Sequence, residues 1–143
     1  MIEQRIYRLV CDYVGAWNRH DADELAALYA DDALYEDLRL PVTLHGCAAI
    51  RGHLYGVFAA CPGAALALGM EPLAANDRAY FEWMTVASCD GQTQELRGVS
   101  VMLIEDGRIV RQTDYPHPVA PGGAFERTSV AVGAVEDNVA WGE

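Results

Sequence analysis

The sequence predicts an α+β fold in which three helices are followed by a curved, mainly antiparallel sheet. Apolar residues recur at helical spacing in the N-terminal half, over residues 3–18 and 47–60. From Gly63 onward they alternate as in strands, and two glycine turns divide the alternating part into a meander. A chain of 143 residues with 52% hydrophobic content is ample for one core, so we expect one domain.

Each helix has its own sequence signals. The first is expected over residues 3–18, where one face carries an apolar stripe. The second follows the capping pattern Asp21-Ala-Asp-Glu24 and should run from Ala22 to about Tyr29. The third spans about Cys47 to Ala60 and stops at Pro62-Gly63, where proline and glycine disfavour continuation. The stripe of the first helix consists of Ile6, Leu9, Val10, Tyr13, Val14 and Trp17.

A short strand is expected between the second and third helices, over residues 33–41. Alternation puts Tyr35, Asp37 and Arg39 on one face of this strand. A carboxylate near the end of a strand that leads into a loop can be partly desolvated, which raises its pKa toward the range useful for proton transfer. Asp37 is therefore the first candidate for a catalytic residue, and an ordinary solvated strand end is the alternative.

The remaining strands form the expected meander. Residues 64–75 make a strand that Gly69 and Pro72 interrupt, so it is bulged or lies at an edge. Strands over residues 78–88, 93–104 and 108–115 follow, with Asp-Gly turns between them. Both faces of the first of these three strands are apolar. We therefore expect helices on one face and the partner subunit of a homodimer on the other.

Composition excludes several classes of function. The formal charge of −11 and the scattered cations argue against nucleic acid as a partner. All ten cations are arginine, and without lysine the chain cannot form a Schiff base, anchor pyridoxal phosphate or build a Walker-type phosphate loop. The four cysteines and four histidines show no metal-ligand spacing, so we expect free thiols, no metal and no cofactor. No membrane span or signal peptide is evident, and we expect a cytoplasmic protein.

The order of elements resembles the nuclear transport factor 2-like superfamily, whose fold is a cone-shaped α+β barrel. Five segments are similar to landmarks of its ketosteroid isomerase and SnoaL-like cyclase branches, and they cover residues 1 to about 118. We expect one domain there, and a C-terminal tail over residues 119–143 with an additional strand at 128–135. The segments are Tyr13-Val-Gly-Ala-Trp-Asn-Arg-His-Asp21, Ala30-Asp-Asp-Ala33, Glu36-Asp37, Gly46-Cys-Ala-Ala-Ile-Arg51 and Asp106-Gly-Arg-Ile-Val110.

The resemblance implies catalytic roles for three residues. In ketosteroid isomerases the general base is the aspartate of a Glu-Asp pair on the first strand, which corresponds to Asp37, and the oxyanion-hole tyrosine of the first helix corresponds to Tyr13. The second oxyanion donor of that branch is a protonated aspartate, and its position falls at about Ser100. In SnoaL-like cyclases and limonene-type epoxide hydrolases an aspartate on the last strand precedes an aromatic residue, as Asp114 precedes Tyr115 here.

Together these positions predict one cavity with Tyr13, Asp37 and Asp114 as its catalytic residues. Two carboxylates in a low-dielectric pocket cannot both ionise cheaply, so one should have a raised pKa and serve as acid while the other serves as base. The cavity is expected to bind substrate through eight further residues, namely Trp17, Tyr35, His53, Phe58, Glu82, Trp83, Ser100 and Met102.

This site predicts a cofactor-independent isomerase or cyclase, with a hydrolase as a further option. Its substrate is expected to be an apolar polycyclic or polyketide-like carbonyl compound, because a base beside a tyrosine can abstract a proton next to a carbonyl and stabilise the enolate. The alternative is a non-catalytic small-molecule-binding or interaction domain, in which the two aspartates only hydrogen-bond buried polar groups.

Overall fold

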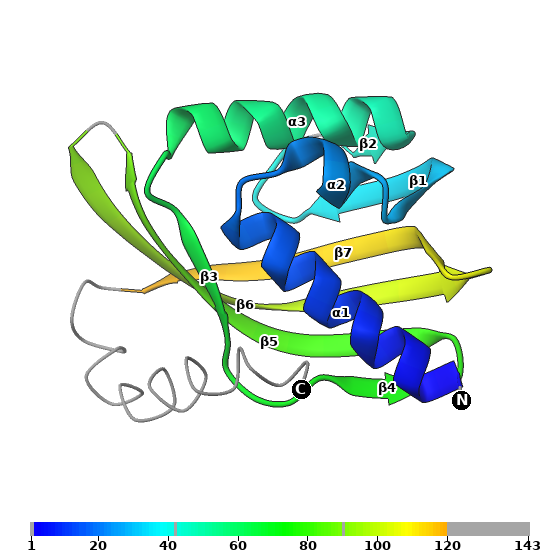
Figure 1. Cartoon of the computed structure of the whole chain (residues 1–143). Coiled ribbons are helices and arrows are strands. Elements are labelled where there is room, and N and C mark those ends of the chain that lie inside the picture. Colours follow the sequence, from blue (N-terminus) through cyan, green and yellow to red (C-terminus); the bar gives the residue numbers. More distant parts are fainter. Residues whose placement is uncertain (1, 42, 90, 120–143) are drawn as a thin grey trace.

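Three helices cover one face of a curved seven-stranded sheet (Figure 1). The computed structural model describes residues 2–41, 43–89 and 91–119. The expected α+β arrangement is confirmed. The helices are α1 (Ile2–Asn18), α2 (Ala22–Ala26) and α3 (Cys47–Ala60), and the strands are β1 (Tyr29–Asp37), β2 (Leu44–His45), β3 (Ala65–Leu68), β4 (Leu73–Ala75), β5 (Arg78–Cys89), β6 (Gln92–Glu105) and β7 (Arg108–Val119).

The sheet has the strand order β2-β1-β7-β6-β5-β3, and β4 also pairs with β5. β5, β6 and β7 form the expected antiparallel meander, whereas β1 lies parallel to β7. The chain between these two strands passes through α3 and the meander before it returns (Figure 1). The first and last strands of the described chain are therefore neighbours.

The core lies between the helices and the inner face of the sheet. Five of the six predicted stripe positions of α1 are buried, and Trp17 packs partly buried against the core. α3 buries Ile50, Leu54 and Phe58, which are four residues apart and so lie on one face of the helix. Fully buried members of the core include Val10, Leu25, Ile50, Phe81, Met102 and Ile109.

The second helix and the first strand do not end where the sequence predicts. Asp21 caps α2 as expected, because its Oδ1 accepts from the backbone N–H of Glu24 at 2.9 Å. The helix stops at Ala26, however, and Tyr29 already belongs to β1. The reason is that the carbonyl of Leu28 accepts from the backbone N–H of Ile109 on β7 at 2.9 Å, which draws this segment into the sheet.

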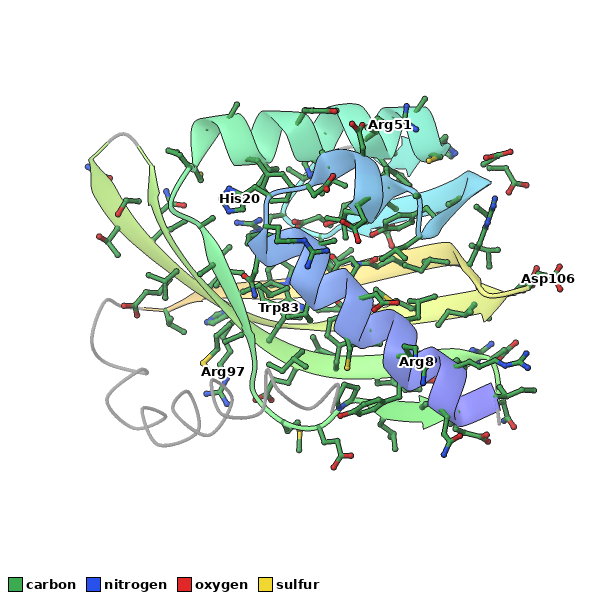
Figure 2. All side chains as sticks on the ribbon, viewed as in Figure 1. Arg8, His20, Arg51, Trp83, Arg97 and Asp106 are labelled. Atoms are coloured by element: carbon green, nitrogen blue, oxygen red, sulfur yellow. The ribbon has the colours of Figure 1, made fainter. Side chains whose placement is uncertain are left out.

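The expected strand over residues 64–75 is two strands, β3 and β4, which both pair with β5. Pro72 lies between them and has no N–H for a ladder hydrogen bond. The turn between β6 and β7 is as predicted, with Asp106 and Gly107 at φ of 51° and 76°. Figure 2 shows Asp106 at the far end of this hairpin.

The outer face of the sheet exposes apolar side chains, among them Val86, Val99 and Tyr115. A homodimer through this face remains a prediction, and the strand expected at residues 128–135 lies outside the described residues. Within the described chain no helix is both long and apolar enough to cross a membrane. Cys61 is disulfide-bonded, so the expectation of free thiols is wrong for this residue, whereas Cys11 and Cys47 are free.

Candidate active site

Two buried aspartates lie side by side in the sheet. Asp37 ends β1 and is the register partner of Asp114 on the parallel strand β7. Ser100 on β6 is in turn the register partner of Asp114. Neighbouring register partners point to the same face of a sheet. The three side chains therefore form one row across β6, β7 and β1, and they are 1%, 7% and 6% exposed in that order.

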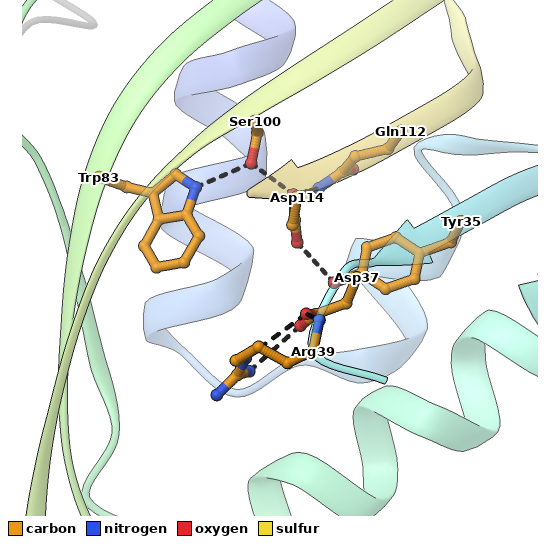
Figure 3. Close-up of polar contacts among 7 residues, drawn as sticks. All are labelled: Tyr35, Asp37, Arg39, Trp83, Ser100, Gln112 and Asp114. Carbon is orange, nitrogen blue, oxygen red and sulfur yellow. Dashed lines mark hydrogen bonds and ion pairs between the residues drawn. The ribbon is translucent and has the colours of Figure 1, made fainter. Parts of the chain in front are cut away.

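The carboxylate of Asp114 accepts three hydrogen bonds from other side chains (Figure 3). Tyr35 Oη donates to Oδ2 at 2.5 Å, while Ser100 Oγ and Gln112 Nε2 donate to Oδ1 at 2.5 and 2.9 Å. Ser100 Oγ itself accepts from Trp83 Nε1 at 2.8 Å, which leaves the serine proton directed at Asp114. Short hydrogen bonds of this kind are typical of an ionised acceptor.

Burial raises the pKa of Asp114 above its ordinary value of 3.8, and the charge of Asp37 acts in the same direction. Hydrogen bonds from Gln112, Ser100 and Tyr35 oppose the shift because they stabilise the charged form. Desolvation is the largest of these effects. Asp114 therefore binds a proton more tightly than an ordinary aspartate does, which suits a group that gives and takes protons.

The amide of Gln112 links Asp114 to two tyrosines. Gln112 is fully buried on β7, and its Oε1 accepts from Tyr29 Oη at 2.5 Å. Its Nε2 donates to Tyr13 Oη at 3.2 Å as well as to Asp114. Burial raises the pKa of Tyr13, and the negative charge of Asp114 adds to that shift. Tyr13 is therefore a neutral hydroxyl at physiological pH.

Asp37 is held by a residue close to it in sequence. Its Oδ1 accepts from the backbone N–H of Arg39 at 2.9 Å, and its Oδ2 lies 3.1 Å from Nη2 of the same residue. The side chain of Arg39 is 43% exposed, so this ion pair stands where the buried row meets solvent. The guanidinium compensates the charge of Asp37 and so weakens the repulsion between the two aspartates.

A cavity of about 520 Å³ lies between α3 and the inner face of the sheet, within the usual size range of small-molecule sites. On α3 the wall is formed partly by Gly52 and Gly56, at which an added Cβ would meet no heavy atom within 4 Å. The cavity lining contains eight of the eleven predicted site residues, namely Tyr13, Trp17, Tyr35, Asp37, His53, Trp83, Ser100 and Asp114.

The other three predicted residues do not line the cavity. Phe58 packs edge-to-face against Trp17 and stacks on His20, with ring centroids 5.3 and 4.6 Å apart. Glu82 points to the outer face, because it alternates with Trp83, and accepts from Arg97 Nη2 at 2.9 Å. Met102 is fully buried in the core. Their predicted roles in substrate binding are not supported by these positions.

His53 contributes a neutral imidazole to the cavity wall. It lies on α3, and its ring centroid is 5.8 Å from that of Tyr35. Burial lowers the pKa of His53 from its ordinary value of 6.5, although Asp37 and Asp114 pull in the opposite direction. A neutral imidazole can both donate and accept a hydrogen bond.

Sequence reasoning missed Gln112, Tyr29 and Arg39 as parts of this site. The signal for Gln112 was present, because alternation puts it on the same strand face as Asp114. The signal for Arg39 was its position two residues after Asp37 on the same face. The sequence predicts Tyr29 at the end of a helix, and no local pattern shows that its hydroxyl reaches β7.

A family model described as the SnoaL-like domain matches residues 10–112. The chain belongs to the SnoaL-like family. The matched range includes Tyr13 and Asp37 and ends two residues before Asp114. Membership confirms the predicted superfamily and branch. No curated protein matches this SnoaL-like sequence.

Two solved structures resemble this SnoaL-like protein in fold. One is a hypothetical protein of Catenulispora acidiphila DSM 44928 with a ketosteroid isomerase-like fold, in complex with trimethylamine; it is 17% identical, with a TM-score of 0.70 over 85% of this chain and 92% of the other. The second is AclR of Streptomyces galilaeus, a candidate hydroxylase, which is 19% identical, with a TM-score of 0.69 over 91% and 98%. At such identities the likeness establishes the shared fold.

Proposed function

We propose that this protein is a cofactor-independent acid/base enzyme, an isomerase or cyclase, that acts on an apolar polycyclic or polyketide-like carbonyl compound. The observation that carries the proposal is that Tyr13, Asp37 and Asp114 line one cavity. A buried hydroxyl beside two buried carboxylates supplies the groups needed to move a proton next to a carbonyl. Membership of the SnoaL-like family supports the same class of chemistry.

In the proposed reaction, Asp114 removes a proton from the carbon next to the substrate carbonyl. Its raised pKa suits this role, because a general base works best when its pKa approaches the working pH. The electron pair of the broken C–H bond moves onto the carbonyl oxygen, and Tyr13 donates a hydrogen bond to the enolate. In an isomerisation the proton returns to another carbon. In a cyclisation the enolate carbon attacks a second carbonyl, and the proton goes to the new alkoxide.

Asp37 is proposed as the second proton carrier. The resemblance to ketosteroid isomerases assigns it the role of base, but its ion pair with Arg39 favours Asp114 as the group that takes the substrate proton. Because Asp37 is the register partner of Asp114 and stands beside a half-exposed arginine, it is suited to pass protons between the buried carboxylate and solvent. Hydrolysis is a further option, in which Asp114 activates a water molecule.

The charges of the cavity favour a neutral substrate. Its lining carries two carboxylates, Asp37 and Asp114, and one guanidinium, Arg39, so an anionic ligand would meet net repulsion. Most of the remaining wall is aromatic or aliphatic, with Trp17, Leu54 and Leu66 among its members. A ring system with a carbonyl directed at Tyr13 fits this distribution of charge and apolar surface.

A non-catalytic small-molecule-binding domain is the second candidate. Three donors already surround Asp114, as they would if its only task were to remain buried and paired. The Catenulispora acidiphila structure contains trimethylamine, and aromatic rings with a carboxylate are the groups that bind amine cations. In this candidate function the cavity would hold a small amine, and Asp114 would be its counter-ion.

The experiment that tests the enzyme is solvent exchange into ketones. Bicyclic to tetracyclic ketones are incubated with the protein in D₂O, and deuterium uptake next to the carbonyl is followed by NMR. We expect uptake above the buffer rate, with a loss of about 10²–10⁴-fold in Asp114→Asn. Asp106→Asn, in the exposed turn of the β6–β7 hairpin, is the matched control. If Asp114→Asn exchanges as fast as this control, the acid/base proposal fails and the binding domain is favoured.

A further inference from the structure

The cavity continues well beyond the two aspartates, along the hairpin of β5 and β6. Its lining includes Thr85 and Ala87 on β5, and Gln94 and Leu96 on β6. Figure 1 shows these two strands curving toward the C-terminal end of α3, and Ala60 at that end of the helix also lines the cavity. The cavity therefore has a second end, which the proposed reaction does not use.

The register of the sheet gives the distance between the two ends. Ser100 belongs to the row of the two aspartates, and Leu96, four positions before it on β6, is the register partner of Thr85. A strand rises about 3.3 Å per residue, so this second row lies about 13 Å from the first along the strand. On the opposite wall α3 lines the cavity from His53 to Ala60, over about 10 Å. The cavity is therefore elongated.

The wall around the second end is mostly apolar. Leu66 on β3 and Leu96 on β6 flank Thr85 in register. Trp83 lies two positions before Thr85 on the same face of β5, and Val57 lines this part of the cavity from α3. A ligand that fills the whole cavity therefore needs an elongated, apolar body between its two ends.

Two neutral polar side chains stand in this apolar surrounding. Thr85 is partly buried and shares a strand face with Trp83, whose indole donates to Ser100 on the inner face of the sheet. Gln94 is exposed at the rim and lies two positions before Leu96, the register partner of Thr85. Such diagonal neighbours are about 7–8 Å apart, so one bound group between them can contact both. Within the described chain neither side chain forms a hydrogen bond with another protein group, so both are available to a ligand.

We propose that Thr85 and Gln94 form a second polar subsite, which binds a hydroxyl or carbonyl oxygen at the far end of an elongated substrate, about 13 Å along the strand from the row of Asp114. This inference deepens the proposed function and rests on it, because it assumes that the reacting carbonyl lies at the Asp114 end. A threonine hydroxyl and a glutamine N–H can each donate to such an oxygen. The substrate class is thus a polycyclic ketone with a second, uncharged oxygen group opposite the reacting carbonyl.

The test is a ligand series in which length and a terminal hydroxyl vary separately. 2-Acetylanthracene, 2-acetylnaphthalene and the 6-hydroxy derivative of each are titrated against wild type by fluorescence. We expect the hydroxyl to raise the affinity of the anthracene by about threefold to tenfold, as one hydrogen bond predicts, and to give no gain in the shorter naphthalene. No gain in the anthracene, or an equal gain in both ligands, would overturn the subsite.

Three substitutions assign the gain to residues. Thr85→Val keeps the branched shape without the hydroxyl, and Gln94→Met keeps the length without the amide. We expect Thr85→Val to lower the hydroxyl gain by about threefold and Gln94→Met to lower it less, with the affinity for 2-acetylanthracene itself unchanged. Thr93→Val is the matched control, because Thr93 alternates with Gln94 and so lies on the opposite face of β6. A gain that both cavity variants retain, or that the control loses equally, would contradict the assignment.

The subsite and the proposed function are tested by different measurements. The hydroxyl gain reports binding, whereas deuterium uptake by the acetyl group of the same ketones reports proton transfer. A hydroxyl gain without uptake would support the subsite and overturn the proposed enzyme, and uptake without a hydroxyl gain would do the reverse. The orientation of the ligand is tested in wild type by NOEs from the Thr85 methyl group. We expect cross-peaks to the ring protons beside the hydroxyl, and cross-peaks to the acetyl group in their place would refute the inference.

Discussion

Gly98→Ala is predicted to be the most damaging single-methyl substitution near the site. Gly98 on β6 is the register partner of Trp83 on β5, and the indole of Trp83 lies over it. A Cβ at this position would lie 2.6 Å from Cζ2 and 2.9 Å from Cη2 of Trp83, and 2.9 Å from the carbonyl oxygen of Tyr115. Non-bonded carbons prefer about 3.5–4.0 Å. Because the backbone oxygen cannot yield easily, the indole has to move.

The magnitude follows from two effects. Overpacking of this kind costs about 1–3 kcal/mol, and the displaced indole would lose the hydrogen bond from Nε1 to Ser100, worth about 0.5–1.5 kcal/mol. We therefore expect the free energy of unfolding to fall by about 2–4 kcal/mol. For a chain of this length that is a fall in Tm of roughly 6–16 °C.

The assay is urea and thermal unfolding beside a matched control. Gly56→Ala adds the same methyl group in α3, where no heavy atom lies within 4 Å, and it should stabilise by up to about 1 kcal/mol through helix propensity. Both variants restrict the unfolded chain in the same way, so their difference reports the native environment. A Gly98→Ala protein within about 0.5 kcal/mol of wild type would refute the claim that the glycine makes room for the indole.

Three further outcomes are expected from the same geometry. Asp37→Asn should abolish most turnover while Tm stays nearly unchanged. The reason is that Arg39, the partner that Asp37 would lose, is half exposed, and such ion pairs contribute only about 0–1 kcal/mol to stability. An unchanged rate of deuterium exchange in this variant would remove Asp37 from the mechanism. The contribution of Asp114 to the free energy of unfolding should decrease as pH rises from about 3.8 through its raised pKa, because the folded state holds that proton more tightly than the unfolded chain does. Urea titrations of wild type and Asp114→Asn across this range check the sign, and a wild type that gained stability relative to the variant would contradict it. Gly56→Leu should fill the cavity and weaken the binding of 2-acetylnaphthalene at least about tenfold, or 1.4 kcal/mol. Ala59→Leu, on the exposed side of α3, should leave the affinity unchanged. Equal affinities of the two variants for this ketone, measured by calorimetry, would show that the ligand lies elsewhere.

The elements that local patterns specify completely were predicted well. α3 runs from Cys47 to Ala60 as expected, because its apolar spacing and the following Pro62-Gly63 are both local signals. The turn at Asp106-Gly107 is equally local, since both residues must adopt positive φ. The predicted boundaries were wrong where pairing with a strand far away in the sequence determines where an element ends. Leu28 pairs with β7, which ended the second helix early, and β5 holds β3 and β4 as separate strands.

The two aspartates of the site also differ in how far along the sequence their hydrogen-bond partners lie. Asp37 is stabilised by Arg39, two residues away, and this partner can be read from the sequence by alternation alone. Asp114 is stabilised by Tyr35, Ser100 and Gln112, which come from three different strands, and Trp83 on a fourth orients the serine. No periodicity within one segment can show which strands will be neighbours, so among these partners only Gln112, two residues before Asp114 on the same strand, could be read from local alternation.

This difference helps to decide which of the two aspartates is the better candidate for the reactive group. The Arg39 pairing of Asp37 needs only the turn after β1, because the two residues are two positions apart in the sequence. The surroundings of Asp114 exist only when β1, β5, β6 and β7 are assembled, and burial in that assembly is the main cause of its raised pKa. A carboxylate whose pKa is raised by burial in the assembled sheet is a candidate for proton transfer. We therefore propose Asp114 as the reactive group, with Asp37 beside it as the residue that passes protons between Asp114 and solvent.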